Sequence, residues 1–147
     1  MDRPVPRDLA ERFLVAAALH EFDRVRHFVE RAGLHPDTTY GGKPTALCYA
    51  VLKPHHGLME FLVARDADCN RADAMGMTPL HYAALGGCET CVAYLIHHGA
   101  RLNVQNRAGK TPLGLAAERP LRDDCRQLLW RHGASTVADR RVVKRFH

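Results

Sequence analysis

The chain has 147 residues, of which 46% are hydrophobic and 25% are charged, and its formal net charge is +5. This length suits one domain with an ample core. The longest apolar run, residues 13–19, is too short to span a bilayer, and residues 1–6 show no basic segment that leads into an apolar stretch. We therefore expect neither a membrane span nor a secretory signal.

The cysteines indicate the compartment. There are five of them, an odd number, and they are scattered along the chain. This usage argues against a disulfide framework and for a reducing environment. We expect a cytoplasmic or nuclear protein.

Apolar residues recur with a period of 33 residues. The series consists of Leu14, Leu47, Leu80 and Leu113, and of Ala17, Ala50, Ala83 and Ala116. A fixed period of this length is typical of a stacked array of repeats. Four units follow, at about residues 8–39, 40–72, 73–105 and 106–137.

The first two units show the repeat least clearly. Residues 7–12 are mostly polar, which suits the solvent-facing end of a terminal unit. Gly41 and Gly42 precede the second unit, so we expect a different turn there from the turns that follow. Asp66 stands where the other units have a glycine, and we expect it to adopt the left-handed conformation that ends a helix.

The third unit is the clearest. Residues 73–76 form a turn signal, in which aspartate bonds the backbone ahead of it and glycine accepts a positive φ. The pair Thr78-Pro79 predicts a helix start, because threonine caps free amides and proline loses no needed donor at the first position. Gly86-Gly87 ends this helix. A second helix is predicted from about Glu89 to a left-handed cap at Gly99.

These residues resemble the ankyrin repeat family. The string Gly76-Met77-Thr78-Pro79-Leu80-His81-Tyr82-Ala83-Ala84 is similar to the family's Gly-x-Thr-Pro-Leu-His-x-Ala-Ala, and residues 106–137 repeat it in part. The resemblance covers about residues 8–137. It implies an all-α solenoid of helix–turn–helix repeats with short β-hairpin fingers, within a domain at 1–138 that is followed by a basic tail at 139–147. It also implies protein binding without enzymatic activity, catalytic residues or cofactors.

In such arrays the finger tips and the ends of the first helices line a concave face. The matching positions that we assign to partner binding are Tyr40, Lys43, Leu52, Lys53, Met75, Met77, Leu85, Arg107, Lys110 and Arg119. The apolar members would be exposed in the free chain, and exposed apolar residues with a charged rim mark interaction sites. The alternative is that Met75 and Met77 fold back on Tyr82 or on the neighbouring finger.

This composition predicts a protein partner with an apolar anchor and acidic flanks, bound by a monomer. A second hypothesis is a targeting or regulatory adaptor that uses the basic tail, from Arg140 to His147, as a nuclear address or to engage an acidic surface. Nucleic-acid binding is disfavoured, since no aromatic residues are interleaved with these charges.

Two groups of residues raise the question of chemistry. Cys88 and Cys91 form a Cys-x-x-Cys, but zinc sites need four ligands and no second pair is suitably spaced, so we interpret Cys91 as a core residue and expect no metal. Cys48 occupies the position that His81 fills one repeat later. A Cys–His enzyme is a weaker alternative hypothesis, because a third group and oxyanion donors are lacking.

The resemblance also points to a modification. Asn70 and Asn103 end their repeats at matching positions. In the family this asparagine bonds the backbone of the finger, and some ankyrin proteins are hydroxylated there by an oxygen-sensing asparaginyl hydroxylase. Hydroxylation of Asn70 or Asn103 is therefore a secondary hypothesis.

Overall fold

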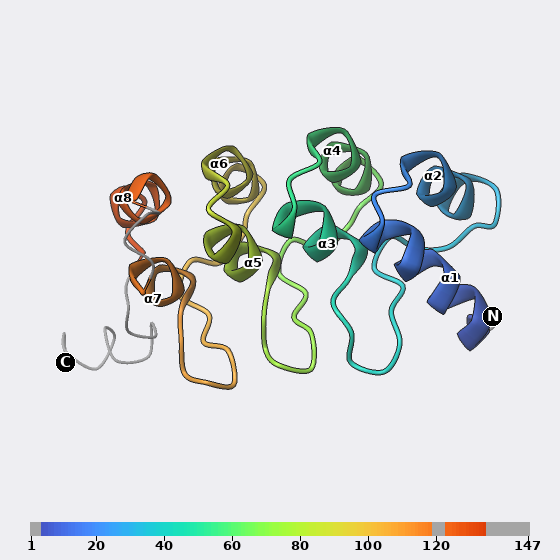
Figure 1. Cartoon of the computed structure of the whole chain (residues 1–147), viewed down its shortest axis with the longest axis horizontal. Coiled ribbons are helices and arrows are strands. Elements are labelled where there is room, and N and C mark those ends of the chain that lie inside the picture. Colours follow the sequence, from blue (N-terminus) through green and yellow to red (C-terminus); the bar gives the residue numbers. More distant parts are fainter. Residues whose placement is uncertain (1–3, 119–122, 135–147) are drawn as a thin grey trace.

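The structure is a computed structural model, and it describes residues 4–118 and 123–134. Within these ranges the chain folds into helix pairs that stack side by side (Figure 1). The inner row consists of α1 (Arg7–Ala18), α3 (Ala46–Leu52), α5 (Pro79–Gly86) and α7 (Pro112–Ala117). The outer row consists of α2 (Phe22–Glu30), α4 (His56–Ala64), α6 (Glu89–His97) and α8 (Asp123–Arg131).

The repeating leucines and alanines form the core between the rows. The four alanines of the series are fully buried, and the four leucines are between 0% and 6% exposed. Small alanine side chains allow each inner helix to pack closely on the next, and each outer helix packs on its inner partner. Burial of each leucine contributes about 1.5–3 kcal/mol. The predicted scaffold positions are therefore confirmed.

Threonines begin the inner helices of the last two repeats. The hydroxyl oxygen of Thr78 accepts a hydrogen bond from the amide of His81, and that of Thr111 accepts one from the amide of Gly114. The amide of Thr78 in turn donates to Nδ1 of His81 at 3.1 Å, which completes a reciprocal cap. Thr45 makes no such cap and donates to Cys48 Sγ instead.

The helix ends agree with the sequence pattern. Asp66 has a φ of 70°, as predicted, in the place where Gly99 has a φ of 87°. The inner helix of the third repeat ends at Gly86, and Gly87 has a φ of 72°. None of the helices formed by the described residues is both long and apolar enough to cross a membrane.

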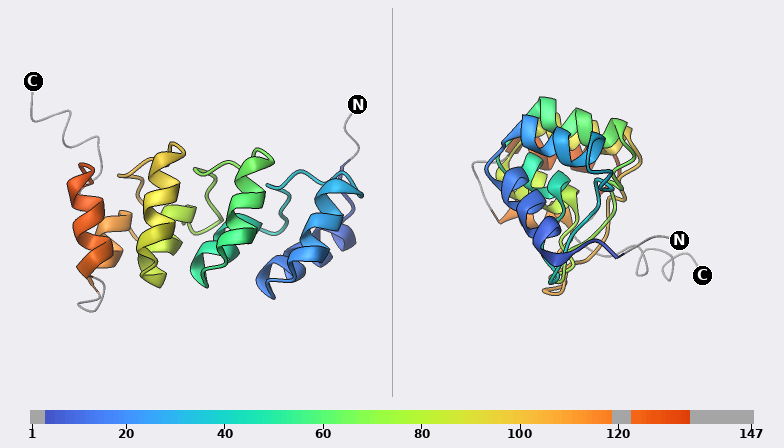
Figure 2. Two further views of the ribbon diagram at one scale, coloured as in Figure 1. Left: turned by 90° about the horizontal axis from the view of Figure 1, so that it is seen from above. Right: turned by 90° about the vertical axis from the view of Figure 1, so that its right-hand side faces the viewer.

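Three loops project as fingers from the same side of the inner row, at residues 31–45, 65–78 and 98–111 (Figures 1 and 2). In the second finger, Oδ1 of Asp73 accepts hydrogen bonds from the amides of Met75 and Met77. In the third finger, Oδ1 of Asn106 accepts hydrogen bonds from the amides of Ala108 and Lys110. The position equivalent to these two residues in the first finger is Tyr40, which is followed by two glycines with positive φ. The first turn thus differs from the other two.

The fingers are turns and not β-hairpins, so this part of the predicted fold is not supported. Adjacent tips share single backbone bonds, from the amide of Ala74 to the carbonyl of Gly42 and from the amide of Arg107 to the carbonyl of Met75, both 2.9 Å long. Too few residues are paired to form a ladder, and the described ranges contain no strand. The expected basic tail at 139–147 and the boundary at residue 138 lie outside the described residues.

Candidate functional site

Met75 lies at the tip of the middle finger. Its side chain is 60% exposed, although its backbone is fixed by Asp73 on its own finger and by Arg107 on the next. An exposed methionine on an anchored backbone presents adaptable apolar surface with little loss of backbone entropy on binding. Met75 therefore has the exposure expected of an apolar anchor.

The other predicted apolar residues are not fully exposed, which corrects the expectation for them. Met77, Leu52 and Leu85 are all partly buried. Sδ of Met77 accepts a hydrogen bond of 3.2 Å from Nδ2 of Asn106, so Met77 contacts the neighbouring finger, as the alternative interpretation proposed. The close packing of adjacent repeats covers these side chains.

The first finger forms a cavity of about 530 Å³. Tyr40 contributes its ring, and the charged ends of Arg7 and Lys43 lie 5.8 Å and 5.6 Å from the ring centre. The remaining lining residues are Val5, Ala10, Thr39 and Gly41. Tyr40 and Lys43 were predicted from the sequence as partner-binding residues, whereas Arg7 was assigned only to the polar end of the first repeat.

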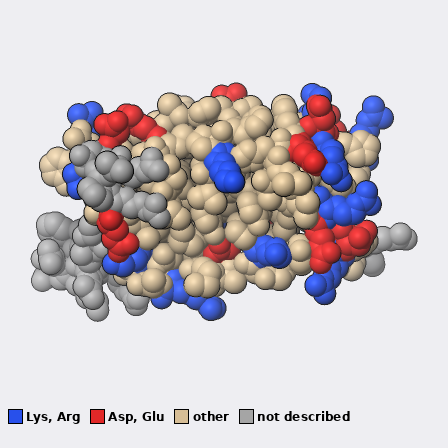
Figure 3. Space-filling view, in the orientation of Figure 1, with Lys and Arg blue, Asp and Glu red and all other residues tan. Residues whose placement is uncertain are grey.

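The other predicted basic residues differ in their surroundings. Lys53 and Arg107 are exposed, whereas Lys110 forms an ion pair of 2.7 Å with Glu118. Exposed ion pairs are weak, so this pair leaves Lys110 available to a partner. Arg119 lies outside the described residues. Charged side chains gather at the two ends of the face in Figure 3, while the central part shows mainly uncharged atoms with isolated basic and acidic groups.

The structure gives Cys48 and His81 separate partners. Cys48 is 1% exposed, accepts a hydrogen bond from Thr45, and burial raises its pKa to about 12. Nδ1 of His81 accepts from Thr78 and its Nε2 bonds the carbonyl of Lys110. A thiol with this pKa stays protonated at neutral pH, so the pair offers no activated nucleophile.

Asn70 joins its finger to the next repeat. Its Nδ2 donates to the carbonyl of Gly99 at 3.1 Å, and its Oδ1 accepts the amide of Arg101 at 2.7 Å. Asp37 occupies the equivalent place one repeat earlier, where its carboxylate accepts the amide of Asp68. Hydroxylation of Asn70 or Asn103 stays a prediction of the resemblance.

Cys88 and Cys91 are joined by a disulfide, with their Cα atoms 5.2 Å apart. Cys91 is fully buried, as its interpretation as a core residue predicts, but the cysteine usage, which argued against a disulfide framework, did not predict this bond. The sequence was searched only for a second, suitably spaced pair of ligands, so His56, whose ring lies beside both sulfurs, was missed. The repeat period was the available signal, since a residue near position 89 meets its counterpart near position 56.

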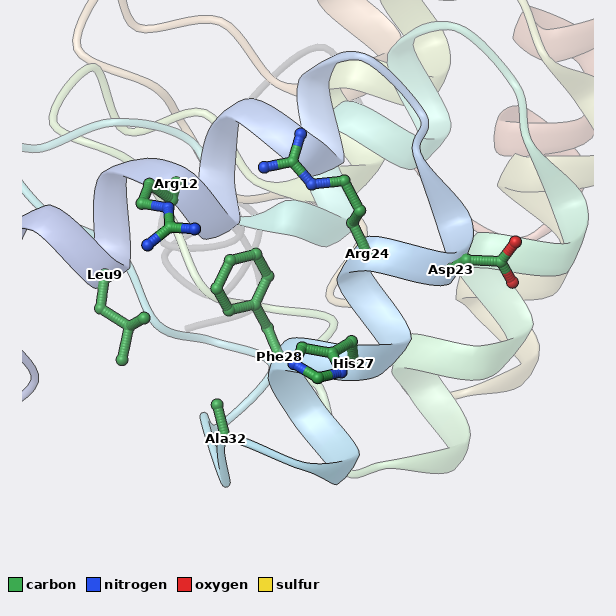
Figure 4. Close-up of a pocket in the computed structure, with 7 residues that line it drawn as sticks. All are labelled: Leu9, Arg12, Asp23, Arg24, His27, Phe28 and Ala32. Carbon is green, nitrogen blue, oxygen red and sulfur yellow. The ribbon is translucent and has the colours of Figure 1, made fainter.

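The open end of the first repeat carries a second cavity, of about 360 Å³ (Figure 4). Phe28 lies below the side chains of Arg12 and Arg24, and Asp23 points away. Both arginines are exposed, whereas Phe28 is only 6% exposed. This arrangement is that of a terminal cap, as the polar residues at the start of α1 predict.

Paired helices in two rows, joined by fingers on one side, define a helical repeat protein. A family model for ankyrin repeats in three copies matches residues 13–106, so the chain belongs to the ankyrin repeat family. Ankyrin repeats are generally protein–protein interaction modules, and the family is typically non-enzymatic.

Similarity extends to ankyrin regions of much longer proteins. The chain is 37% identical over 62 residues to an ankyrin and IPT/TIG repeat-containing protein of Schizosaccharomyces pombe, which is 42% of this chain and 5% of that protein. It is 32% identical over 84 residues to human transient receptor potential cation channel subfamily A member 1, a match that covers 57% of this chain and 8% of that protein. It is 36% identical over 90 residues to an ankyrin repeat protein of fowlpox virus, a match that covers 58% of this chain and 12% of that protein. The chain thus spans a small part of each relative.

Proposed function

We propose that this chain is a non-catalytic scaffold or adaptor that binds another protein through its finger tips and the neighbouring ends of the inner helices. The observation that carries the proposal is the exposure of Met75 at the centre of three bonded finger tips. A flexible apolar side chain on a backbone that is fixed from two sides offers contact area with little loss of backbone entropy, which suits binding.

The charges on either side define the chemistry of the partner. Arg7 on α1 and Lys43 on the first finger flank Tyr40, and Arg107 lies at the tip of the third finger. A partner segment that packs an apolar side chain against Met75 and carries carboxylates on either side of it would complement this arrangement. Arg7 and Lys43 are both exposed, and the ion pair of Arg7 with Glu11 is a weak surface pair, so both cations are open to carboxylates of a partner near the first finger.

A targeting role through the basic tail is the alternative. It is supported by Arg140, Arg141, Lys144 and Arg145 in the sequence, which form a cationic cluster. On either hypothesis we propose a cytoplasmic or nuclear monomer. Deletion of residues 139–147 separates the two: a tail-based adaptor loses its localisation, whereas a finger-based scaffold keeps its partner.

The proposal is tested by affinity capture with Met75→Glu. Met77 is left intact because its contact with Asn106 holds the third finger. Trp130→Glu is the matched control, since Trp130 is 72% exposed but lies on outer helix α8, away from the fingers. We expect acidic proteins captured by the wild type to be lost with Met75→Glu and kept with Trp130→Glu. Equal capture by both variants would refute the assignment.

A further inference from the structure

The N-terminal ends of α4 and α6 bring three metal-binding side chains together. His56 is the first residue of α4, Cys88 is the N-cap of α6, and Cys91 lies one turn into that helix. One potential ligand atom from each lies within 4.8 Å of the other two. Because the two helices belong to successive repeats, residues that are far apart in sequence share one site.

The surroundings suit anionic sulfur. The amide of Cys91 donates to Cys88 Sγ at 3.1 Å, and the positive end of the α6 dipole lies at the same place. The hydroxyl of Thr90 is 3.3 Å from Nε2 of His56 and 3.4 Å from Cys88 Sγ, so it links the imidazole to this sulfur. His56 is exposed, Cys88 is partly buried and Cys91 is fully buried, so an ion can enter from the His56 side.

We propose that the reduced chain binds a zinc-class divalent ion through Sγ of Cys88, Sγ of Cys91 and a ring nitrogen of His56. Two thiolates and one imidazole are a donor set that zinc prefers, with water in the fourth position of the tetrahedron. Two thiolates also neutralise the charge of the ion, which reduces the cost of holding it in a partly buried site. The ion cross-links the second and third repeats.

The disulfide and the metal site exclude each other, because bonded sulfurs carry no thiolate. Reduction by a phosphine breaks the S–S bond: phosphorus supplies two electrons, water supplies the oxygen of the phosphine oxide and the two protons, and two thiols result. The metal ion then binds the two sulfurs and releases their two protons to solvent. The site is thus open only in the reduced chain.

Titration of the phosphine-reduced chain with Co²⁺ as a probe tests the site. We expect one equivalent to produce a thiolate-to-cobalt absorption band that Zn²⁺ bleaches, and we expect Zn²⁺ to raise Tm as its concentration increases. The disulfide form should show neither effect. Absence of the band from the reduced wild type, or an equal band from the oxidised chain, would overturn the proposal.

Variants identify the ligands. Cys88→Ser should abolish the band, and His56→Gln should weaken zinc affinity at least about tenfold. His97→Gln is the matched control, because His97 is exposed at the far end of α6, and it should bind as the wild type does. Equal weakening by His56→Gln and His97→Gln, or unchanged affinity in His56→Gln, would refute the site. Since His56 is exposed, its variant tests the site even if Cys88→Ser perturbs the fold.

Discussion

His81 on α5 is hydrogen-bonded to Lys110 on the next finger. Nε2 of the imidazole donates to the Lys110 carbonyl at 2.9 Å, while Nδ1 accepts the amide of Thr78 at 3.1 Å. These partners require the neutral ring with its proton on Nε2. The side chain is fully buried, and burial lowers the pKa of His81 below its ordinary value of 6.5. One histidine thus caps a helix and couples two repeats.

Replacement of His81 by cysteine, the residue at the equivalent position 48, should destabilise the chain. We expect a loss of about 2 kcal/mol in the free energy of unfolding at pH 7.5, since Thr78 and Lys110 both lose a buried partner. Urea denaturation of both chains measures the difference. A loss that remains within error of zero would contradict the coupling.

The loss of unfolding free energy caused by His81→Cys should also become smaller as the pH falls. Because the folded pKa of His81 is lowered, the unfolded chain binds more protons below pH 6.5, and the stability contributed by the neutral ring is lost as pH falls through this value. At pH 5.5 the difference between the chains should be smaller by up to about 1 kcal/mol. A difference independent of pH would show that His81 is protonated equally in both states.

Asp37→Asn should stabilise the chain at neutral pH. The side chain of Asp37 is 11% exposed, and burial raises the pKa of its carboxyl above 3.8. Asparagine at the equivalent position 70 both accepts and donates hydrogen bonds across the repeat boundary. We expect a gain of about 1 kcal/mol at pH 7, because a neutral amide avoids the cost of a partly buried charge.

The pH dependence separates this effect from a general effect of charge. With a raised folded pKa, the wild type loses stability as pH rises through 3.8 toward the folded value, so the gain from Asp37→Asn should decrease at pH 3.5. Thermal unfolding of the wild type and of Asp37→Asn at pH 3.5 and at pH 7 measures this gain in stability. Asp124→Asn removes the same charge from an exposed position on α8 and serves as the control. Equal gains in both variants would contradict the prediction.

Asp66→Gly should also be stabilising. Asp66 has a φ of 70°, and glycine has a φ of 87° at the equivalent position 99. A left-handed conformation costs a residue with a β-carbon about 1–2 kcal/mol, part of which is offset by the greater freedom of glycine when unfolded. We expect a net gain of about 0.5–1 kcal/mol in thermal or urea unfolding. Asp66→Ala retains the β-carbon and should show no gain, and a matching gain would exclude backbone strain as the cause.

Cys48 should resist alkylation in the folded chain. Its thiol is 1% exposed, and burial raises its pKa to about 12, so almost no thiolate forms at pH 8. Treatment with iodoacetamide followed by peptide mass spectrometry should leave Cys48 unmodified in buffer and modified in urea. Equal labelling in both conditions would revive the Cys–His hypothesis.

Much of the scaffold follows from spacing along the chain. The 33-residue period identifies Leu80 and Ala83 as buried, Thr78-Pro79 as a helix start and Asp66 as a left-handed helix end. These features depend on side chains within one or two helical turns of each other, so sequence separation determines them. The β-hairpin expectation was not supported because a finger of this length makes too few backbone pairs.

Contacts between repeats could not be predicted in the same way. The sequence by itself determined the 33-residue period, the helix ends of the third repeat and the buried positions that repeat. Only the tertiary structure decided that Met75 is exposed while Met77 contacts Asn106, that Arg7 lies beside Tyr40, and that His56 lies beside Cys88 and Cys91. Such contacts depend on how closely and at what angle successive helix pairs pack, which the periodicity leaves open and the shapes of the buried side chains decide.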